Sequence, residues 1–283
     1  MGERHGGLPP PRVTLSRSQV TDLIGRYGLR PSRALGQNFV TDPNTVRRIA
    51  RMAGVGPGDR VLEIGPGLGS LTLALAETGA AVTAVEVDRQ LIPVLDEVLS
   101  GQAGARVVHA DAMTADWAAL LGDRPDWVLV ANLPYNIATP LVADLLDRVP
   151  VVARMLVMVQ REVGERLCAG PGEEAYGAVS VKVRYWAEAR LAGRVAPSVF
   201  HPRPNVESVL VDIRRRSAPA VDPAVVAPER LFSVVRAGFA TRRKMLRRAL
   251  AGVVEPEAFA AAGVAPESRA EDLDVAAWGR LAR

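Results

Sequence analysis

Two short segments combine residue types and spacing that suit ligand binding and chemistry. The first is a glycine-rich turn, Gly65-Pro66-Gly67-Leu68-Gly69, directly after a short apolar run. Glycines are needed in such a turn because the backbone bends tightly and a Cβ atom would keep a ligand away from it. The second is the tetrapeptide Asn132-Leu133-Pro134-Tyr135, which also follows an apolar run. It combines amide and carbonyl acceptors, a rigid proline and an aromatic ring.

The spacing of the glycines indicates which kind of ligand the turn binds. It reads G-x-G-x-G, whereas a dinucleotide fingerprint reads G-x-G-x-x-G, and Pro66 removes a backbone N–H that a pyrophosphate would use. These differences favour S-adenosylmethionine, which has no phosphate, over a nicotinamide dinucleotide. We therefore expect Gly65 and Gly67 to contact this cofactor. A glycine turn with a purely structural role is the alternative.

Two acidic residues follow the next two predicted strands. Glu86 stands 21 residues after Gly65, where a carboxylate can accept hydrogen bonds from both ribose hydroxyls. Asp111 follows the third strand and is suited to accept a hydrogen bond from an adenine amino group. Either acid alone is typical of a solvated strand end. Two of them beyond a glycine turn predict a cofactor site, because ligands of such sheets bind at the carboxyl ends of the strands.

The tetrapeptide predicts methylation of an exocyclic amine. Such an amine is a poor nucleophile because its lone pair is delocalised into the ring. The Asn132 side chain and the Leu133 carbonyl would accept its N–H groups and favour a pyramidal, more nucleophilic nitrogen. Pro134 would stiffen this backbone, and Tyr135 would stack on an unstacked base. The alternative is an ordinary Asn-Pro turn with a core tyrosine.

The elements that must position these residues alternate between strands and helices. Buried strands are predicted at 61–64, 81–86, 106–109, 127–131 and 155–159, and helices at 70–78, 89–99, 115–121 and 138–147. This alternation is typical of an α/β doubly wound sheet, in which helices join parallel strands. Before it, Ser16 and Asp42 are predicted helix N-caps. After it, the alternating residues 206–213 predict a further strand.

Composition divides the chain into three predicted parts. Residues 1–12 resemble a disordered tail, 13–216 form the methyltransferase domain, and 217–283 form a smaller all-α domain with helices at 228–250, 255–262 and 274–281. Residues 201–250 carry 11 basic and 4 acidic side chains, whereas 61–200 carry 11 and 17. A basic segment beside an acidic one favours a nucleic-acid partner, with solvation of exposed helices as the alternative.

Six cations without an intervening acid lie on the predicted helix 228–250: Arg236, Arg242, Arg243, Lys244, Arg247 and Arg248. Arg236, Arg243 and Arg247 would share one helical face. The cluster predicts an RNA-binding surface that contacts phosphates, and such contacts supply affinity rather than sequence choice. If about six phosphates are neutralised, the log–log slope of affinity against salt is about −5. A solvated helix face is the alternative.

Composition also excludes several classes of protein. One cysteine among 283 residues cannot form an internal disulfide, so a reducing cytoplasm is expected. The N-terminal residues lack the apolar core of a signal peptide, and no stretch approaches the ~20 apolar residues of a membrane span. Three scattered histidines and Cys168 give no familiar metal-ligand spacing, so no metal is expected. His109, on a predicted strand, is expected in the core, and the protein is expected to be a monomer.

With these segments considered together, the sequence resembles the ribosomal RNA adenine N6,N6-dimethyltransferases, and most closely the small-subunit branch linked to kasugamycin resistance. The resemblance covers about residues 29–283. It depends on six motifs in order, at 35–40 (LGQNFV), 63–67 (EIGPG), 132–136 (NLPYN), 175–177 (AYG), 200–208 (FHPRPNVES) and 239–244 (FATRRK). Gly36 and Leu133 favour the small-subunit branch over the large-subunit enzymes of macrolide resistance.

The resemblance implies a Rossmann-like class I methyltransferase fold. The implied reaction is N6,N6-dimethylation of adenines in a hairpin of small-subunit (16S) ribosomal RNA, with S-adenosylmethionine as donor, on an immature small subunit during its biogenesis. The residues implied to line the cofactor site are Asn38, Val40, Gly65, Glu86, Asp111 and Asn132. Tyr135 and Phe200 are implied to enclose the target adenine. The family usually has leucine where Val40 stands, which matters little if the contact is made by the backbone.

Four alternatives remain open from the sequence. A large-subunit RNA adenine methyltransferase is the nearest, and a DNA adenine methyltransferase shares a similar tetrapeptide. A ribosome-assembly factor with secondary methylation is an alternative of another class. A nicotinamide-dependent dehydrogenase is the weakest, because of the glycine spacing.

Overall fold

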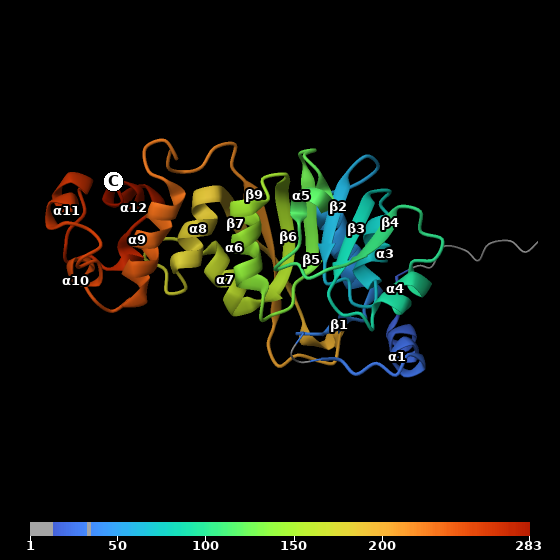
Figure 1. Ribbon diagram of the computed structural model, residues 1–283. Helices are drawn as coiled ribbons and strands as arrows, with labels where there is room; N and C mark the ends of the chain where they lie inside the picture. Colours follow the sequence, from blue (N-terminus) through green and yellow to red (C-terminus); the bar gives the residue numbers. More distant parts are fainter. Residues whose placement is uncertain (1–13, 33–34) are drawn as a thin grey trace, which may run out of the picture. The chain divides into compact units, whose positions relative to one another are not determined.

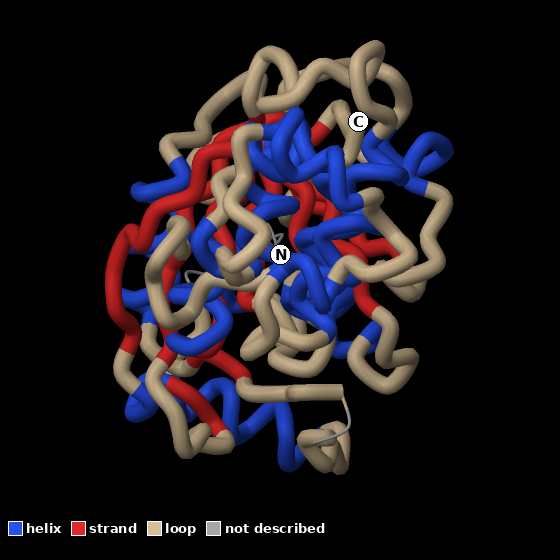
Figure 2. Tube along the Cα trace, turned by 90° about the vertical axis from the view of Figure 1, so that its left-hand side faces the viewer, coloured by secondary structure: helices blue, strands red, loops and turns tan. Residues whose placement is uncertain are grey.

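The computed structural model describes residues 14–32 and 35–283, so the predicted tail at 1–12 lies outside the described residues. The chain forms two compact units. One comprises the residues up to 136 together with 195–207, and the other comprises 137–194 together with 208–283. Helices and strands both recur along the trace (Figure 2).

The first unit holds a parallel sheet and its crossover helices. Its elements in chain order are α1 (Arg17–Arg26), β1 (Phe39–Val40), α2 (Pro43–Ala53), β2 (Arg60–Ile64), α3 (Ser70–Ala76), β3 (Ala81–Glu86), α4 (Ile92–Val98), β4 (Ala105–His109), α5 (Trp117–Leu121), β5 (Trp127–Asn132), the 3-10 helix η1 (Pro197–Val199) and β8 (Phe200–His201). Strands β4, β3, β2 and β5 lie side by side in that order, and neighbours are parallel (Figure 1). Strands β1 and β8 form a separate antiparallel pair.

The residues at the N-terminal ends of α1 and α2 form the helix caps that the sequence predicts. Ser16 caps α1 in a capping box, in which its N–H donates to Gln19 Oε1 at 2.8 Å and its Oγ accepts from the Gln19 N–H at 3.4 Å. Asp42 caps α2 through Oδ2, which accepts from the Thr45 N–H at 3.0 Å. Both helices therefore begin where the sequence predicts, because capping satisfies N–H groups within one turn of the cap.

Strand β4 corrects one expectation. The sequence predicts a buried strand with His109 in the core, but β4 lies at one end of the strand order, and His109 is exposed with Nε2 3.2 Å from the Val87 carbonyl oxygen. An edge strand has a neighbour on one side only, so its side chains are covered less than those of a central strand.

The second unit contains the remaining elements. They are α6 (Ala138–Arg148), β6 (Val152–Gln160), α7 (Arg161–Cys168), α8 (Ala178–Trp186), β7 (Ala187–Val195), β9 (Ser208–Arg215), α9 (Pro228–Ala240), α10 (Leu246–Ala249), α11 (Pro256–Ala262), the 3-10 helix η2 (Ala270–Asp272) and α12 (Val275–Leu281). Strands β6, β9 and β7 are neighbours in that order, with β6 and β9 antiparallel. The sequence did not predict β7, because many of its side chains are exposed and no apolar alternation marks it.

The two packing units meet at other positions than the proposed domain boundary at residues 216–217, which stays a prediction. Residues 137–194 and 208–216 cluster with the helical residues 217–283, because aromatic side chains from α8 and the loop before it pack on α9. The Tyr185 ring lies 5.1 Å from that of Phe232, and the Tyr176 ring lies 5.9 Å from that of Phe239. Shared apolar burial of this kind joins segments into one packing unit.

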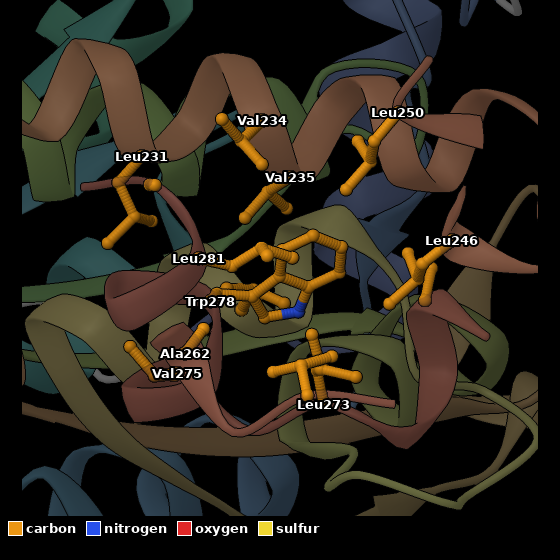
Figure 3. Close-up of a cluster of buried hydrophobic side chains, with 14 of the residues drawn as sticks. Leu231, Val234, Val235, Leu246, Leu250, Ala262, Leu273, Val275, Trp278 and Leu281 are labelled. Carbon is orange, nitrogen blue, oxygen red and sulfur yellow. The ribbon is translucent and has the colours of Figure 1, made fainter. Parts of the chain in front are cut away.

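The core of the second unit surrounds Trp278 of α12. This side chain is fully buried, and Val235, Leu246 and Leu273 lie around it (Figure 3). A Cβ atom added at Gly238 would lie 2.5 Å from Trp278 Cη2, so α9 can approach the indole only because residue 238 is glycine.

The predicted continuous helix at 228–250 is wrong. Helix α9 ends at Ala240, because Thr241 leaves the helical region with φ −127° and ψ 57°, and α10 begins only at Leu246. Tertiary contacts stabilise the break: the Leu246 N–H donates to the Ser268 carbonyl at 2.8 Å, and Arg242 bonds to the loop at 170–177. Arg236, Arg243 and Arg247 consequently do not share one helical face, because only Arg236 lies on α9.

Candidate functional site

The glycine turn follows β2 and has an unusual backbone. Gly65, Gly67 and Gly69 have φ values of +69°, +59° and +86°, which side chains with a Cβ rarely adopt. The backbone N–H of Gly65 donates to the Val85 carbonyl at 2.9 Å, and that of Gly69 donates to the Pro66 carbonyl at 2.9 Å. The Gly67 N–H donates to Glu86 Oε2 at 3.2 Å.

This pattern of hydrogen bonds tests which ligand the turn fits. A turn that cradles a pyrophosphate points free N–H groups at it. Here the N–H groups of Gly65, Gly67 and Gly69 are already used, and Pro66 has none. An added Cβ at Gly65 would lie 3.6 Å from Pro134 Cδ, so the turn and the tetrapeptide are in van der Waals contact at this residue. The turn therefore suits a ligand that lies against the backbone without a phosphate, as S-adenosylmethionine does.

Glu86, at the end of β3, is placed beside the turn. Its side chain is 4% exposed, and its Oε1 accepts from the Asp88 N–H at 2.9 Å while Oε2 accepts from Gly67. Burial raises the pKa of this carboxyl group, and the hydrogen bonds oppose that shift. Since two carboxylate oxygens offer about four acceptor positions, two backbone bonds leave Glu86 able to accept from ribose hydroxyls.

Asp111 lies at the same edge of the sheet, beyond β4. The Ala110 N–H donates to the Glu86 carbonyl at 3.0 Å, so the ends of β3 and β4 are held together. The Asp111 side chain is exposed, and its Oδ1 accepts from the Met113 N–H at 2.8 Å. The remaining carboxylate positions face solvent, where an amino group of a ligand can reach them.

Asn132 ends β5, and its amide has a defined orientation. Its Nδ2 donates to the Asn38 carbonyl oxygen at 3.1 Å, which joins the tetrapeptide to a loop 94 residues earlier. A carbonyl oxygen can only accept, so the NH₂ group must face Asn38 and the Oδ1 acceptor must face the other way. The Oδ1 atom is therefore the part of this side chain that can accept a hydrogen bond from a substrate amine.

Pro134 packs between two glycines. A Cβ added at Gly36 would lie 3.1 Å from Pro134 Cβ, and one added at Gly65 would lie 3.6 Å from Pro134 Cδ. Gly36 also has a φ of +63°, so both its conformation and its surroundings favour glycine. The tetrapeptide thus contacts both the glycine turn and the 35–41 loop, while the Leu133 side chain anchors it in the core at 1% exposure.

The 35–41 loop brings three further predicted residues to this region. Val40 of β1 pairs with Phe200 of β8, and Asn38 directly precedes β1. The Phe200 ring is only 1% exposed, whereas Tyr135 is half-buried. Of these two rings, Tyr135 is therefore the one with surface that a base can contact as the structure stands.

Two residues near the site, Gln37 and Glu63, were not assigned a role from the sequence. Gln37 Nε2 donates to Asp88 Oδ2 at 2.7 Å, which ties the loop to the residues just after β3. Gln37 belongs to the LGQNFV motif, so the motif is the signal that marks it, although its partner cannot be read from the chain.

Glu63, in the middle of the buried strand β2, is the second. Its carboxyl group is 1% exposed, and Oε2 has no hydrogen-bond partner among the described residues. Burial, and to a lesser extent the nearby Glu86 carboxylate, raises the pKa of Glu63 to about 8. A carboxyl group on an otherwise apolar strand is the sequence signal, and near neutral pH it holds its proton.

The predicted RNA-binding cations lie in the second unit and fall into two groups. Arg242 pairs with Glu271 at 2.7 Å and donates to the Glu174 carbonyl at 2.6 Å, and Arg247 pairs with Glu267 at 3.0 Å. The side chains without an ion pair or hydrogen bond to any described residue are those of Arg236, Arg243, Lys244 and Arg248. These four cations without a partner among the described residues lie on α9, on the 241–245 loop and on α10.

Residues 14–32 and 35–283 contain neither a metal-binding cluster nor a membrane-spanning helix. No group of three or more histidine, cysteine or acidic side chains there could hold a metal ion. Cys168 is half-buried at the end of α7, and burial raises the pKa of its thiol to about 11. None of the helices in this part of the chain is both long enough and apolar enough to cross a membrane.

Comparison with known sequences identifies close relatives. A model of the family described as ribosomal RNA adenine dimethylase matches residues 29–283. The Streptomyces coelicolor protein named ribosomal RNA small subunit methyltransferase A is 47% identical, over 97% of this chain and 98% of its own length. The Thermobifida fusca protein of the same name is 48% identical, over 95% of each chain.

Solved structures show the same fold. The 23S rRNA methyltransferase ErmE matches with a TM-score of 0.68 at 29% identity, over 87% of this chain and 98% of that one. A dimethyladenosine transferase from Plasmodium falciparum matches with a TM-score of 0.70 at 22% identity, over 86% and 95%. These similarities confirm the predicted α/β methyltransferase fold with an additional helical part.

Proposed function

Because the chain belongs to the ribosomal RNA adenine dimethylase family, we propose that it dimethylates N6 of adenines in small-subunit (16S) ribosomal RNA, with S-adenosylmethionine as donor. The small-subunit assignment is supported by full-length relatives at 47% and 48% identity that carry that name. The observation that carries the chemistry is the orientation of Asn132, whose Nδ2 is held by Asn38 while Oδ1 stays available beside the glycine turn.

The proposed cofactor site consists of residues at the carboxyl ends of β2, β3 and β4. S-adenosylmethionine, when bound, supplies a methyl group activated by its positively charged sulfur. Gly65 and Gly67 provide a backbone surface without side chains, Glu86 accepts from the ribose hydroxyls, and Asp111 accepts from the adenine amino group. Asn38 and Val40 cover the site from the 35–41 loop.

In the proposed mechanism the protein acts mainly by positioning the target amine. Asn132 Oδ1 and the Leu133 carbonyl accept its N–H groups, which favours a pyramidal nitrogen with an available lone pair. Pro134 keeps these acceptors in place because it is packed between Gly36 and the glycine turn. Tyr135 stacks on the base. A near-attack separation of ~3–3.5 Å between reacting atoms is sufficient to explain a large rate gain without a nucleophilic side chain.

Phe200 contributes differently from Tyr135 in this proposal. Since its ring is buried in the described state, we infer that it packs behind the site through β8 until the β1–β8 pair or a neighbouring side chain moves aside. Stacking by Phe200 on the adenine accordingly requires a local rearrangement when RNA binds.

A labelled-methyl assay tests the function. The protein and S-adenosylmethionine are incubated with immature small subunits, protein-free 16S RNA, 23S RNA and duplex DNA, and the nucleosides are analysed by mass spectrometry. We expect N6,N6-dimethyladenosine from the small-subunit substrates, most of all from immature particles. Activity on 23S RNA alone would instead support the activity named for the relative ErmE, and no dimethyladenosine from either RNA would overturn the proposal.

Asn132→Ala is predicted to abolish methyl transfer while leaving particle binding and folding intact. The substitution removes the acceptor for the substrate amine, a loss we expect to reduce the rate by at least about 10². Single-turnover methylation measures it, with Asn44→Ala, an exposed asparagine on α2, as the control. If the Asn132→Ala protein still supports subunit assembly fully in cells, binding rather than methylation is the dominant role.

We further propose that the protein works as a monomer in the cytoplasm on partly assembled small subunits. The basic side chains of the second unit support an RNA partner of this kind. Sedimentation of the protein with and without immature subunits tests the oligomeric state and the partner. A dimer in either sample would contradict the proposed monomer, and a failure to sediment with the subunits would contradict the proposed partner.

A further inference from the structure

A pocket in the second unit lies among α6, α8 and α9 and has a volume of about 250 Å³. Its walls are mainly apolar, with Pro140 and Ala143 from α6, Val179 from α8, and Phe232 and Val235 from α9. We call it the three-helix pocket. None of its lining residues belongs to the methyl-transfer site.

The polar groups around the pocket are of two kinds. Lys182 is already neutralised, because its Nζ pairs with Asp147 and lies 4.6 Å from the centre of the Phe232 ring. Asp147 also accepts from Trp186 Nε1 at 2.7 Å, so this carboxylate is satisfied. Arg236 differs, because its guanidinium is exposed and makes no ion pair with any described residue.

The pocket therefore offers an apolar cavity with one free cation at its wall. Such a site fits a ligand that has a flat apolar body and an attached anion. A nucleotide of single-stranded RNA has this chemistry, since every base has a π-face that stacks without regard to sequence and carries a neighbouring phosphate. The other acid of α6, Asp144, pairs with Arg148 and adds no repulsion.

The position of Arg236 on α9 favours RNA over a protein ligand. Residue 236 lies about 6 Å along the helix axis from Ala240, at 1.5 Å per residue. The 241–245 loop follows directly and carries the free cations Arg243 and Lys244. One RNA backbone can therefore contact Arg236 and this loop together.

We propose that the three-helix pocket binds one unstacked base of the RNA substrate, with the adjacent phosphate on Arg236. The inference rests on the proposed function. Thr139 is the one hydroxyl among the lining residues, so the pocket has few groups to read a base edge and accepts any base. It acts as an anchor that fixes RNA on the second unit, separate from the adenine that is methylated.

Two substitutions test the proposal in the full-length protein. Ala143→Leu fills the pocket from α6, and its control is Ala260→Leu on the exposed face of α11. Arg236→Gln removes the cation, and its control is Arg230→Gln on the same helix, where the guanidinium donates to the Val253 carbonyl at 3.0 Å. Circular dichroism melts establish that each variant folds. Affinity is measured over a range of salt for protein-free 16S RNA and for immature subunits.

We expect Ala143→Leu to weaken binding to both substrates about tenfold with an unchanged salt slope, since it removes a stacking contact and no charge. Arg236→Gln should make the log–log salt slope shallower by about 0.7, the value for one phosphate of a single strand.

The results that would contradict the proposal differ clearly from the expected ones. If Ala143→Leu and Arg236→Gln bind protein-free RNA as their controls do, the proposal is overturned, and a loss confined to particles would identify a ribosomal protein as the occupant. Methyl transfer by the wild type is scored in the same samples. If the two variants bind RNA as their controls do while the wild type still methylates, only the inference about the pocket is rejected. If the wild type does not methylate RNA, the proposed function is rejected.

Discussion

Single residues around the glycine turn combine backbone and packing requirements. Gly67 illustrates this, because it has a positive φ, its N–H is bonded to Glu86, and an added Cβ would lie 2.9 Å from Phe39 Cδ1. Phe39 follows Asn38, which holds Asn132. A change at Gly67 should therefore affect the Asn132 amide, which we propose accepts the substrate amine.

Gly67→Ala is predicted to reduce both stability and cofactor binding. The left-handed backbone alone costs about 1–2 kcal/mol, and displacement of Phe39 adds to it. Gly28→Ala is the matched control, because Gly28 has nearly the same φ of +60° but nothing within 4 Å of an added Cβ. Denaturant unfolding and calorimetric titration with S-adenosylmethionine compare the two. Equal loss of cofactor affinity in both variants would count against the role of Phe39.

Glu63 makes a prediction about pH. Its pKa is raised by burial from 4.5 to about 8, so the folded protein binds this proton more tightly than the unfolded chain does. The resulting stabilisation is complete below about pH 4.5 and is lost as the pH rises toward 8. Glu63→Gln removes this dependence of stability on pH, because the amide of glutamine does not titrate.

The melting temperature of Glu63→Gln minus that of wild type should therefore increase between pH 6 and pH 8.5. The expected change is on the order of 2 kcal/mol, or roughly 4–8 °C at about 2–4 °C per kcal/mol. Calorimetric scans at both pH values measure it, and the difference isolates Glu63 from groups that titrate in both proteins. A difference that stays flat over this range would show that Glu63 is ionised throughout.

At the scale of elements, the end of α9 determines what each cation can do. Arg242 holds the 241–245 loop against η2 and the 170–177 loop through Glu271 and the Glu174 carbonyl. Arg243, the next residue, has no such contact within the described residues. Neighbouring arginines of one motif thus have different roles, one in maintaining the loop and the other available to a phosphate.

Arg242→Gln and Arg243→Gln are predicted to separate these roles. Arg242→Gln should lower stability by about 1 kcal/mol, as expected for a partly exposed ion pair with an extra hydrogen bond. Arg243→Gln should leave the melting temperature unchanged and weaken RNA binding with a shallower salt slope. Thermal melts and filter binding on the same preparations measure both effects. The assignment fails if Arg242→Gln melts like wild type and loses RNA affinity as Arg243→Gln does.

At the scale of the whole molecule, charge is unevenly distributed although the net charge is only +4. The acidic side chains predominate in residues 61–200, whereas the candidate RNA-binding cations lie between 236 and 248. Such separation directs a polyanion toward the basic part of the chain. The ion pairs of Arg242 and Arg247 reduce the cations available there from six to four.

The salt dependence of RNA binding is predicted to reflect four phosphates rather than six. At about −0.9 per phosphate, the log–log slope should be about −3.6 instead of the about −5 expected from the sequence. Filter binding to 16S RNA over a series of salt concentrations gives the slope. A value near −5 would show that RNA displaces both ion pairs, and a slope near zero would contradict an RNA-binding role for this cluster.

The sequence by itself determined the features that depend on neighbouring residues. The N-caps at Ser16 and Asp42, the strand-turn-helix at Gly65 and the tetrapeptide after β5 are formed by contacts within a few positions, so their patterns are visible in the chain. The parallel direction of β2 to β5 also follows, because each strand is joined to the next by a helical crossover.

The tertiary structure decided what depends on distant partners. The amide of Asn132 is oriented by a carbonyl 94 residues away, and Arg242 forms an ion pair with Glu271. Helix α9 ends at Ala240 because residues of the 241–245 loop bond to other segments. Phe200 became buried, and three helices formed a pocket that no motif marks. Burial and ion pairing are properties of surfaces brought together by folding, so a linear pattern cannot specify them.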